Sequence, residues 1–305
     1  MISSSRQVVA VNNTALITAI KHFAIHDGDG IRTTVFFKGC GLKCVWCHNP
    51  EGISFHEQLA YMVEKCVNCG QCCECEANRI EEGKHIFDRQ RCRVCGRCLS
   101  RCPNGAFRLY GREMTVDEVL AEVLEDKAFY ANSGGGVTLS GGEALYHTDF
   151  CVDLLKKLKE QGIHTAVDTS GFVPDGAIEK VMPYTDIFLF DLKAADPQVH
   201  KRCTGHTNER ILQNLQWIDS HEKDVEIRIP FVPDFNDGEI PAIADIIGSL
   251  HRVKRVRVLP YHSYARSRYA ALGMTDTLPE TIPNEERISA ARLLLQQRLP
   301  FIDIN

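Results

Sequence analysis

The chain has 305 residues, of which 44% are hydrophobic and 25% charged, a composition typical of a globular protein with a sizeable core. The formal net charge of −5 argues against nucleic acid as a partner, because neutralising phosphates requires an excess of basic residues. No apolar run approaches the roughly 18 residues of a membrane-spanning helix. Polar residues interrupt the first 20 positions, so this stretch lacks the continuous hydrophobic core of a signal peptide. We therefore expect neither a membrane protein nor a secreted precursor.

Six short runs rich in β-branched and aromatic residues are predicted to form strands, with helical patterns between them. The strand candidates are residues 33–37, 137–140, 164–170, 186–193, 225–232 and 256–262. The helical candidates are residues 115–127, with a capping-box pattern at Thr115 and Glu118, and roughly 148–161, 208–220, 238–249 and 285–297. Strands that alternate with helices indicate a parallel sheet, and polar clusters at the strand ends are typical of barrel active sites. Six units rather than eight predict an α/β fold with a partial (β/α)6 TIM-like barrel.

The composition divides the chain into three regions. Residues 1–59 form the start of the barrel with the first cysteine group, and residues 113–305 form the rest of the barrel. Residues 60–112, here called the cysteine-rich segment, hold nine Cys and few long apolar runs. Such a segment cannot bury a core of its own, so we expect bound metal to hold it together.

The cysteine content is unusually high and clustered: the chain has 14 cysteines, and 12 of them lie in the range from Cys40 to Cys102. A disulfide scaffold would be short and secreted, whereas clustered thiols in a reducing compartment are typical of metal ligands. We therefore expect a cytoplasmic protein that binds metal.

The first cysteine group has the spacing C-x3-C-x2-C, formed by Cys40, Cys44 and Cys47. Three thiolates can hold three irons of a cubane cluster and leave the fourth iron free to bind a small molecule, which is a catalytic arrangement. Structural zinc is the alternative, but it needs a fourth ligand, and His48 is badly spaced to supply one.

This spacing directly after a first strand is the signature of the radical S-adenosylmethionine (SAM) superfamily. Within it, the chain resembles the glycyl-radical-enzyme activating proteins, whose motifs it carries in family order at residues 26–51, 133–143, 167–172, 190–193 and 259–262. It departs from them at Asp29 and Ala144, where the family usually has Pro. Because Pro fixes φ, these two changes weaken expectations about loop rigidity but touch no cluster ligand.

The resemblance implies a reaction. SAM binds the open iron of a [4Fe–4S] cluster, one electron breaks its S–C5′ bond, and the products are methionine and a 5′-deoxyadenosyl radical. That radical abstracts a hydrogen from the α-carbon of a glycine in the protein substrate, a glycyl radical enzyme. A reduced flavodoxin or ferredoxin would supply the electron, in an anaerobic cytoplasm.

The resemblance also assigns residues to SAM. The segment that contacts its amino group consists of Gly141, Gly142 and Glu143. Oxygen atoms that help hold a monovalent cation, Na⁺ or K⁺, beside its carboxylate come from Asp168, Thr169 and Asp191. The alternatives are a tight turn for the glycines and solvated loop carboxylates for the acids.

Five further residues are candidates for the same site. Lys193 and Arg228 are placed to meet the carboxylate or ribose of SAM. Trp46 packs against the adenine or belongs to the core, and His262 lies near SAM or is structural. Asp27 matches the residue that faces the partner's glycine loop, with a simple turn residue as the alternative.

The cysteine-rich segment carries a second pattern. Cys92, Cys95, Cys98 and Cys102, followed by Pro103, fit the run of bacterial two-cluster ferredoxins, in which the fourth Cys binds the other cluster. The upstream group is less regular, with Glu76 where a standard run has Cys. The predicted ligand sets are Cys66, Cys69, Cys72 and Cys102 for one [4Fe–4S] cluster, and Cys75, Cys92, Cys95 and Cys98 for the other. Cys73 is a rival for Cys72 or Cys75, and the spacing leaves open whether these clusters relay electrons or only hold the segment together.

Many of the activating proteins that the chain resembles carry such a segment, so the resemblance, with three clusters, implies an activator of a dehydratase, decarboxylase or lyase. Two alternatives stay open: a radical SAM peptide maturase with auxiliary clusters, and a non-catalytic ferredoxin-like electron carrier. Maturases usually carry their extra Cys toward the C-terminus, and here none follows Cys203. Cys151 and Cys203 are expected to be buried small hydrophobic residues.

Overall fold

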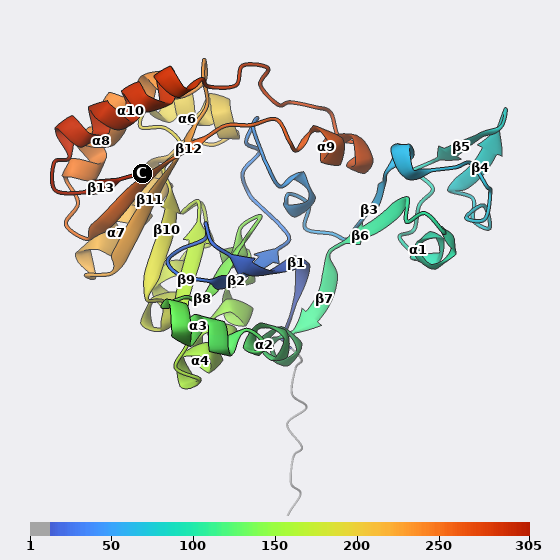
Figure 1. The fold of residues 1–305 in the computed structure, drawn as a ribbon, viewed down its shortest axis with the longest axis horizontal. Helices are drawn as coiled ribbons and strands as arrows, with labels where there is room; N and C mark the ends of the chain where they lie inside the picture. The colour runs from blue at the N-terminus through green and yellow to red at the C-terminus, as the bar shows by residue number, and fades with distance from the viewer. Residues whose placement is uncertain (1–12) are drawn as a thin grey trace, which may run out of the picture.

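The computed structural model describes residues 13–305, and most of the N-terminal stretch searched for a signal peptide, residues 1–12, lies outside the described part. A nine-stranded sheet forms the centre of the molecule, with the strand order β13-β12-β11-β10-β9-β8-β2-β1-β7 (Figure 1). In chain order these strands are β1 (Thr14–Ala24), β2 (Arg32–Phe37), β7 (Arg112–Thr115), β8 (Gly136–Gly141), β9 (His164–Thr169), β10 (Ile187–Asp191), β11 (Asp224–Phe231), β12 (Val253–Pro260) and β13 (Asp303–Ile304).

The predicted parallel sheet is confirmed. The six predicted strands correspond to β2 and β8–β12, which lie side by side in chain order, each parallel to the next. Apart from β12, in which only Val256 and Val258 are buried, their central residues are almost all buried, which explains the near-continuous apolar runs that identified them. A parallel sheet of this order is consistent with the partial TIM barrel of radical SAM proteins.

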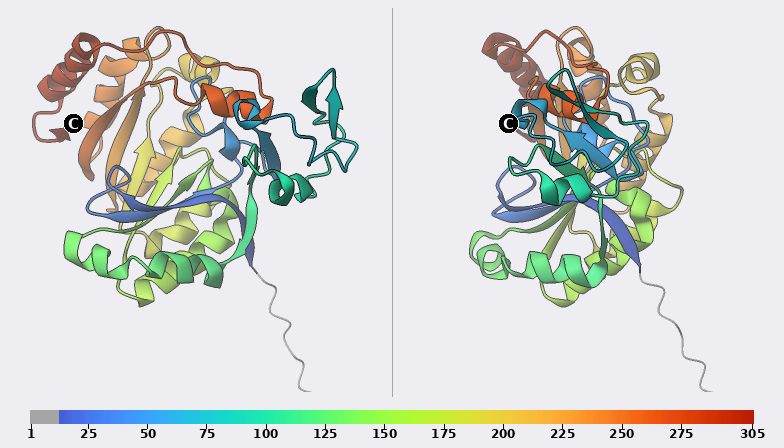
Figure 2. Two further views of the ribbon diagram at one scale, coloured as in Figure 1. Left: turned by 45° about the vertical axis from the view of Figure 1, so that its right-hand side comes forward. Right: turned by 90° about the vertical axis from the view of Figure 1, so that its right-hand side faces the viewer.

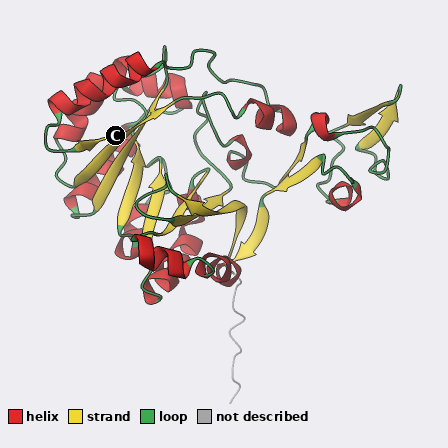
Figure 3. Cartoon of the chain, in the orientation of Figure 1, coloured by secondary structure: helices red, strands yellow, loops and turns green. Residues whose placement is uncertain are grey.

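Helices follow the strands, and apart from α9, which packs against β3 (Gln58–Tyr61) at the base of the cysteine-rich segment, they cover the outer side of the curved sheet (Figure 3). They are α2 (Val116–Leu124), α3 (Lys127–Ser133), α4 (Thr148–Glu160), α5 (Ala177–Val181), α6 (Pro197–Thr204), α7 (Glu209–Ser220), α8 (Ile240–Gly248), α9 (Arg266–Leu272) and α10 (Glu285–Arg298). The capping box predicted at Thr115 and Glu118 is present, with both reciprocal hydrogen bonds, at the start of α2. None of the helices in residues 13–305 has the length and hydrophobicity that crossing a bilayer requires.

Three strands of the sheet were not predicted: β1, β7 and the two-residue β13, which pairs parallel to β12. β1 precedes the expected first strand and runs antiparallel to both β2 and β7. Only its first half alternates between buried and partly exposed residues, and its second half has no buried residue and places Lys21 and His22 beside the exposed Phe23, so it lacks a strand-length apolar pattern. The sheet therefore extends beyond the six parallel units by an antiparallel edge.

The cysteine-rich segment projects to one side of the sheet (Figure 2). β3 (Gln58–Tyr61) and β6 (Phe107–Tyr110) pair antiparallel at its base, and β4 (Asn78–Glu81) and β5 (Lys84–Phe87) form a hairpin at its far end. The one helix between them is the short α1 (Arg97–Arg101). Arg89 ties this segment to α9, because its guanidinium donates hydrogen bonds to the backbone oxygens of Leu59 and Ala271.

Candidate active site

A cavity of about 280 Å³ opens at the carboxyl ends of the parallel strands. Most of the residues that the sequence assigns to one site line it: Asp27, Cys40, Cys44, Trp46, Cys47, Gly141, Gly142, Asp168, Thr169, Asp191, Lys193 and Arg228. These residues are far apart in the chain and meet because parallel strands end at one edge of the sheet. Glu143 and His262 do not line the cavity.

The first cysteine loop, residues 38–52, follows β2 and forms one wall of this cavity. The N–H groups of Lys43 and Val45 donate to the backbone oxygens of Thr204 and Cys203, at 2.8 and 2.9 Å, which anchors the loop to the end of α6. Burial raises the pKa of the Cys40 thiol to about 12, so in the absence of a metal ion this thiol is neutral. Binding to iron would replace that proton.

The sulfurs of these three cysteines do not lie together as closely as the ligands of a single tetrahedral ion. A tetrahedral zinc site brings its ligand atoms within about 4 Å of one another, given Zn–S bonds of about 2.3 Å. In residues 13–305, only Cys72, Cys73 and His85 form a group of three such ligand atoms within 4.8 Å, and that group lies in the cysteine-rich segment. The first cysteine loop is thus not shaped as a closed zinc site.

The two glycines after β8 are required by close backbone packing. Gly141 has a φ of +118°, and a Cβ there would lie 2.2 Å from the Phe37 nitrogen. A Cβ on Gly142 would lie 2.3 Å from the backbone oxygen of Gly52, in the first cysteine loop. Any larger residue would push this loop away from the sheet. The glycines therefore fix the position of the cysteine loop as well as exposing backbone to the cavity.

Glu143 lies behind the cavity wall and joins the ends of β8 and β9. Its carboxylate accepts hydrogen bonds from the Thr169 hydroxyl at 3.0 Å and from the Ser170 N–H and hydroxyl at 2.8 and 2.7 Å. Burial raises the pKa of Glu143 to about 7, although these donors favour the ionised form. The side chain thus positions the strand-end loop that carries Thr169.

This burial predicts a pH-dependent stability. Because the pKa of Glu143 lies near 7 in the folded protein and near 4.5 in the unfolded chain, the folded state binds more protons between these values. The stability contributed by Glu143 is therefore lost as pH rises through this range. Relative to wild type, Glu143→Gln should gain up to about 3 kcal/mol in unfolding free energy from about pH 5 to about pH 8, measured by denaturant titration. A pH-independent difference between the two proteins would contradict this.

Arg228, on β11, is the centre of a buried charged cluster. Its guanidinium nitrogens lie 3.6 Å from Asp168, 3.9 Å from Asp27 and 3.3 Å from Glu226, and it donates to the backbone oxygen of His26 at 2.7 Å. The other oxygen of Asp168 accepts a bond from Ser140 at 2.6 Å. Burial raises the pKa of Asp168 to about 6, while Arg228 opposes that rise. The cluster holds two carboxylates at the cavity wall.

A second ion pair lies beside the cysteine loop. Lys193 is buried, and its ammonium group pairs with Asp191. Burial opposes the charge on Lys193, but the Asp191 carboxylate raises the pKa of the ammonium above its ordinary value, so it stays protonated. The cavity wall therefore carries the positively charged ammonium group of Lys193 next to the carboxylate oxygens of Asp191.

The aromatic candidates take different positions. Trp46 is 4% exposed and packs edge-on against Phe235, so it belongs to a small core cluster and also lines the cavity. His262 stacks on His48, with ring centroids 4.1 Å apart, and His48 itself lines the cavity. Burial lowers the pKa of His48 to about 4, which makes this ring neutral. His262 lies one side chain behind the cavity.

Sequence reasoning missed several residues that complete the site: Ser140, Ser170, His48 and Glu226. Glu226 had a usable signal, because it stands two positions from Arg228 in a strand that is otherwise apolar, and alternate residues of a strand share a face. The bonds of Ser140 and Ser170 depend on the pairing of β8 with β9, which no single segment reveals.

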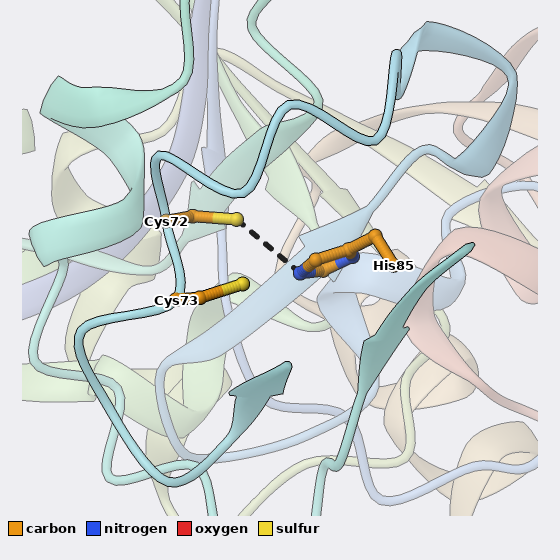
Figure 4. A group of neighbouring side chains, drawn as sticks. All are labelled: Cys72, Cys73 and His85. Atoms are coloured by element: carbon orange, nitrogen blue, oxygen red, sulfur yellow. Dashed lines mark hydrogen bonds between the residues drawn. The ribbon is translucent and has the colours of Figure 1, made fainter. Parts of the chain in front are cut away.

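A second cavity, of about 400 Å³, lies in the cysteine-rich segment. Its cysteines are Cys75, Cys92, Cys95 and Cys98. Of the other predicted ligands, Cys66, Cys72 and Cys102 pack with Tyr61 and Phe107 in a small apolar cluster that also includes Cys92 and Cys98, and Cys69 is exposed. Figure 4 shows Cys72 and Cys73 pointing toward His85 on β5.

Comparison with known proteins gives concordant results. The family model of the radical SAM superfamily matches residues 34–247. The chain is 36% identical to the (2S)-3-sulfopropanediol dehydratase activating enzyme of Klebsiella oxytoca, over 85% of this chain and 86% of the relative. It is 40% identical to the benzylsuccinate synthase activating enzyme of Thauera aromatica, over 85% and 82%.

A solved structure supports the fold alone. The crystal structure of Streptococcus suis SuiB bound to the precursor peptide SuiA aligns with 87% of this chain and 46% of the SuiB chain, with a TM-score of 0.53 at 14% sequence identity. Since the family model covers most of the chain and the relatives align with 85% of it, the chain belongs to the radical SAM superfamily and, within it, to the activating enzymes of glycyl radical enzymes.

Proposed function

We propose that Cys40, Cys44 and Cys47 hold the radical SAM cluster in the 280 Å³ cavity and that SAM binds beside it. The observation that carries this is that one cavity joins the three thiols to the glycine turn, to the strand-end carboxylates of Asp168 and Asp191, and to the loop carboxylate of Asp27. When bound, the cluster supplies one electron to the sulfonium of SAM, whose S–C5′ bond breaks to give methionine and a 5′-deoxyadenosyl radical.

The surrounding residues orient SAM. The exposed backbone at Gly141 and Gly142 faces the amino group, while the cationic Lys193 and Arg228 attract the carboxylate or ribose oxygens. Asp168, Thr169 and Asp191 offer oxygen atoms for a monovalent cation, Na⁺ or K⁺, next to that carboxylate. Trp46 provides an apolar wall for the adenine.

The protein substrate is a glycyl radical enzyme, and we propose one of the dehydratase, decarboxylase or lyase type. Asp27 lies at the cavity wall and is partly exposed, with Thr34 donating to its carboxylate at 2.8 Å. This position is accessible to a loop that enters the cavity from outside. The substrate glycine would have to reach the same space as the ribose of SAM.

We also propose that the cysteine-rich segment holds two auxiliary [4Fe–4S] clusters. The second cavity, lined by Cys75, Cys92, Cys95 and Cys98, supports one ligand set. Backbone N–H groups point at three cysteine sulfurs, with Val94 donating to Cys92 at 3.4 Å and Ala106 donating to Cys102 at 3.2 Å among them. Val94 has a φ of 51°, which a β-branched residue adopts rarely, and this strained turn fits a loop that wraps around a cluster.

The electron donor would be a reduced flavodoxin or ferredoxin. Between Arg89 and Arg101 the chain has five arginines and no acidic residue. Within the described residues, Arg93 and Arg97 are exposed, have no carboxylate within 4.0 Å, and line the second cavity next to the exposed Cys95. Such a surface would attract a donor with an acidic face. We place this reaction in an anaerobic, reducing cytoplasm.

The test is the formation of a glycyl radical. The chain, reconstituted anaerobically with iron and sulfide, is mixed with dithionite, SAM and the glycyl radical enzyme encoded beside its gene. We expect the doublet signal of a glycyl radical in the electron paramagnetic resonance spectrum, and its absence when alanine replaces the substrate glycine. SAM cleavage without a doublet on any candidate partner would favour a peptide maturase, and failure to cleave SAM would leave an electron carrier.

A further inference from the structure

A buried polar pair, Asn78 on β4 and His85 on β5, lies between the two groups of cysteines in the cysteine-rich segment. Asn78 is 4% exposed and His85 is 6% exposed. The β4–β5 hairpin contributes no cysteine, so neither residue belongs to a ligand set predicted from spacing. A buried amide and a buried imidazole are costly unless they have hydrogen-bond partners, so what they contact indicates what they do.

Each predicted ligand set contributes one sulfur to this pair. The Asn78 amide nitrogen donates to the Cys75 sulfur at 3.2 Å, and the Asn78 amide oxygen lies 3.1 Å from His85 Nε2. The same Nε2 lies 3.2 Å from the Cys72 sulfur (Figure 4). A chain of three hydrogen bonds therefore runs from Cys75 through Asn78 and His85 to Cys72.

If both sulfurs are iron-bound thiolates, they can only accept hydrogen bonds. This determines which atom donates and which accepts in each of the three hydrogen bonds. Asn78 must then turn its NH₂ toward Cys75 and its oxygen toward His85. His85 Nε2 faces two acceptors, so it must carry the proton. His85 Nδ1 is then the bare nitrogen, and among residues 13–305 it is indeed buried without a partner. The orphaned atom thus agrees with thiolates at both ends.

The surroundings hold the His85 ring rigidly. Its edge meets the rings of Tyr61 and Phe107, with centroids 5.0 and 5.9 Å away. Its backbone N–H donates to the side chain of Asn68 at 2.9 Å, and the Asn68 N–H in turn donates to the Cys66 sulfur at 3.4 Å. The ring is therefore held in a dry position where a single N–H···S bond has a large electrostatic effect.

We propose that Asn78 and His85 are positioning residues that set the reduction potentials of the two auxiliary clusters by donating one hydrogen bond to a ligand sulfur of each. The inference rests on the two clusters proposed above, and it selects Cys72 over Cys73 as the ligand next to His85. Reduction adds one negative charge to a cluster, so an N–H···S bond stabilises the reduced form more than the oxidised form and raises the potential.

The experiment uses the full-length protein with its iron–sulfur clusters reconstituted, and it measures iron content and a redox titration followed by electron paramagnetic resonance. His85→Phe keeps an aromatic ring against Tyr61 and Phe107 but removes the donor. We expect it to move one auxiliary potential to a more negative value. Asn78→Leu removes the donor to Cys75 and the acceptor that orients His85, so it should move both. The potential of the radical SAM cluster should stay unchanged.

Two further variants separate tuning from simple packing. His85→Gln retains an N–H donor of similar reach and should restore the potential toward the wild-type value. The matched control is Gln71→Leu, which removes an exposed amide of the same segment that has no hydrogen bond to a sulfur within the described residues. It should leave all potentials unchanged.

Three results would overturn the proposal. Wild-type potentials in both His85→Phe and Asn78→Leu, at full iron content, would mean that the pair does not tune the clusters. Stoichiometric zinc that is lost on replacing Cys73 or His85 would make His85 a metal ligand instead. Iron and spin counts for only one cluster in the wild-type protein would refute the proposed auxiliary clusters themselves, whatever the variants do.

Discussion

Replacing Cys44 by Ala is expected to abolish SAM cleavage, reducing the yield of 5′-deoxyadenosine to that of a solution without protein. Cys44 is the middle member of the three thiols on the cavity wall, and the pattern leaves no spare ligand. With two thiolates remaining, the site lacks the third protein ligand that leaves a single iron open. The measurement is chromatographic detection of 5′-deoxyadenosine after anaerobic incubation with dithionite and SAM.

The control for this prediction is Cys151→Ala. Cys151 is a buried thiol on α4 whose hydrogen bond goes to the backbone oxygen of Ala144, so its loss removes a core sulfur but no proposed iron ligand. This variant should cleave SAM at close to the wild-type rate. Undiminished cleavage by Cys44→Ala would refute the assignment of the radical SAM cluster, even if the auxiliary clusters were intact.

Replacing Arg228 by Met should destabilise the protein by about 3 to 5 kcal/mol, because it leaves buried carboxylates without their central cation. The volume of the side chain is roughly kept, so the loss reports charge rather than a cavity. The cost should be larger at about pH 8 than at about pH 6, since Asp168 already has a raised pKa and protonates more easily once Arg228 no longer opposes this. Denaturant titration of both proteins at the two pH values measures the difference.

Two control variants test whether the loss of stability comes from the charge of Arg228. Arg257→Met removes another partner of Glu226, at 3.1 Å, but its side chain is 19% exposed and it contacts no carboxylate of the cavity within the described residues. It should cost less than Arg228→Met. Arg228→Lys keeps the charge and should recover much of the stability. An equal loss in Arg228→Met and Arg257→Met would show that the cavity cluster has no special electrostatic role.

The parallel core of the fold was predictable because its strands are buried on both faces. A run such as residues 186–193 is apolar over several consecutive positions, which few other elements allow. β1 and β7, at one side of the sheet, escaped prediction because only part of each strand is buried. Their place in the sheet depends on the pairing of β1 with β2 and of β7 with β1, contacts between distant segments that local composition does not encode.

The same contrast applies to the candidate site. The cysteine spacing, the glycine turn and the strand-end acids are visible because each is a local pattern at a strand end. The resemblance gave no indication that Glu143 turns away from the cavity to hold Ser170, because this depends on how β8 packs beside β9. The hydrogen bonds of His85 were equally invisible, since they join a hairpin to a loop 13 positions away.

The antiparallel stem of β3 and β6 brings both ends of the cysteine-rich segment to neighbouring points, with strands about 5 Å apart. The whole cysteine-rich segment can therefore be inserted or removed by a single recombination event that moves no strand of the parallel core. A designer can exchange such segments between activating enzymes at this junction and leave the site at the strand ends in place.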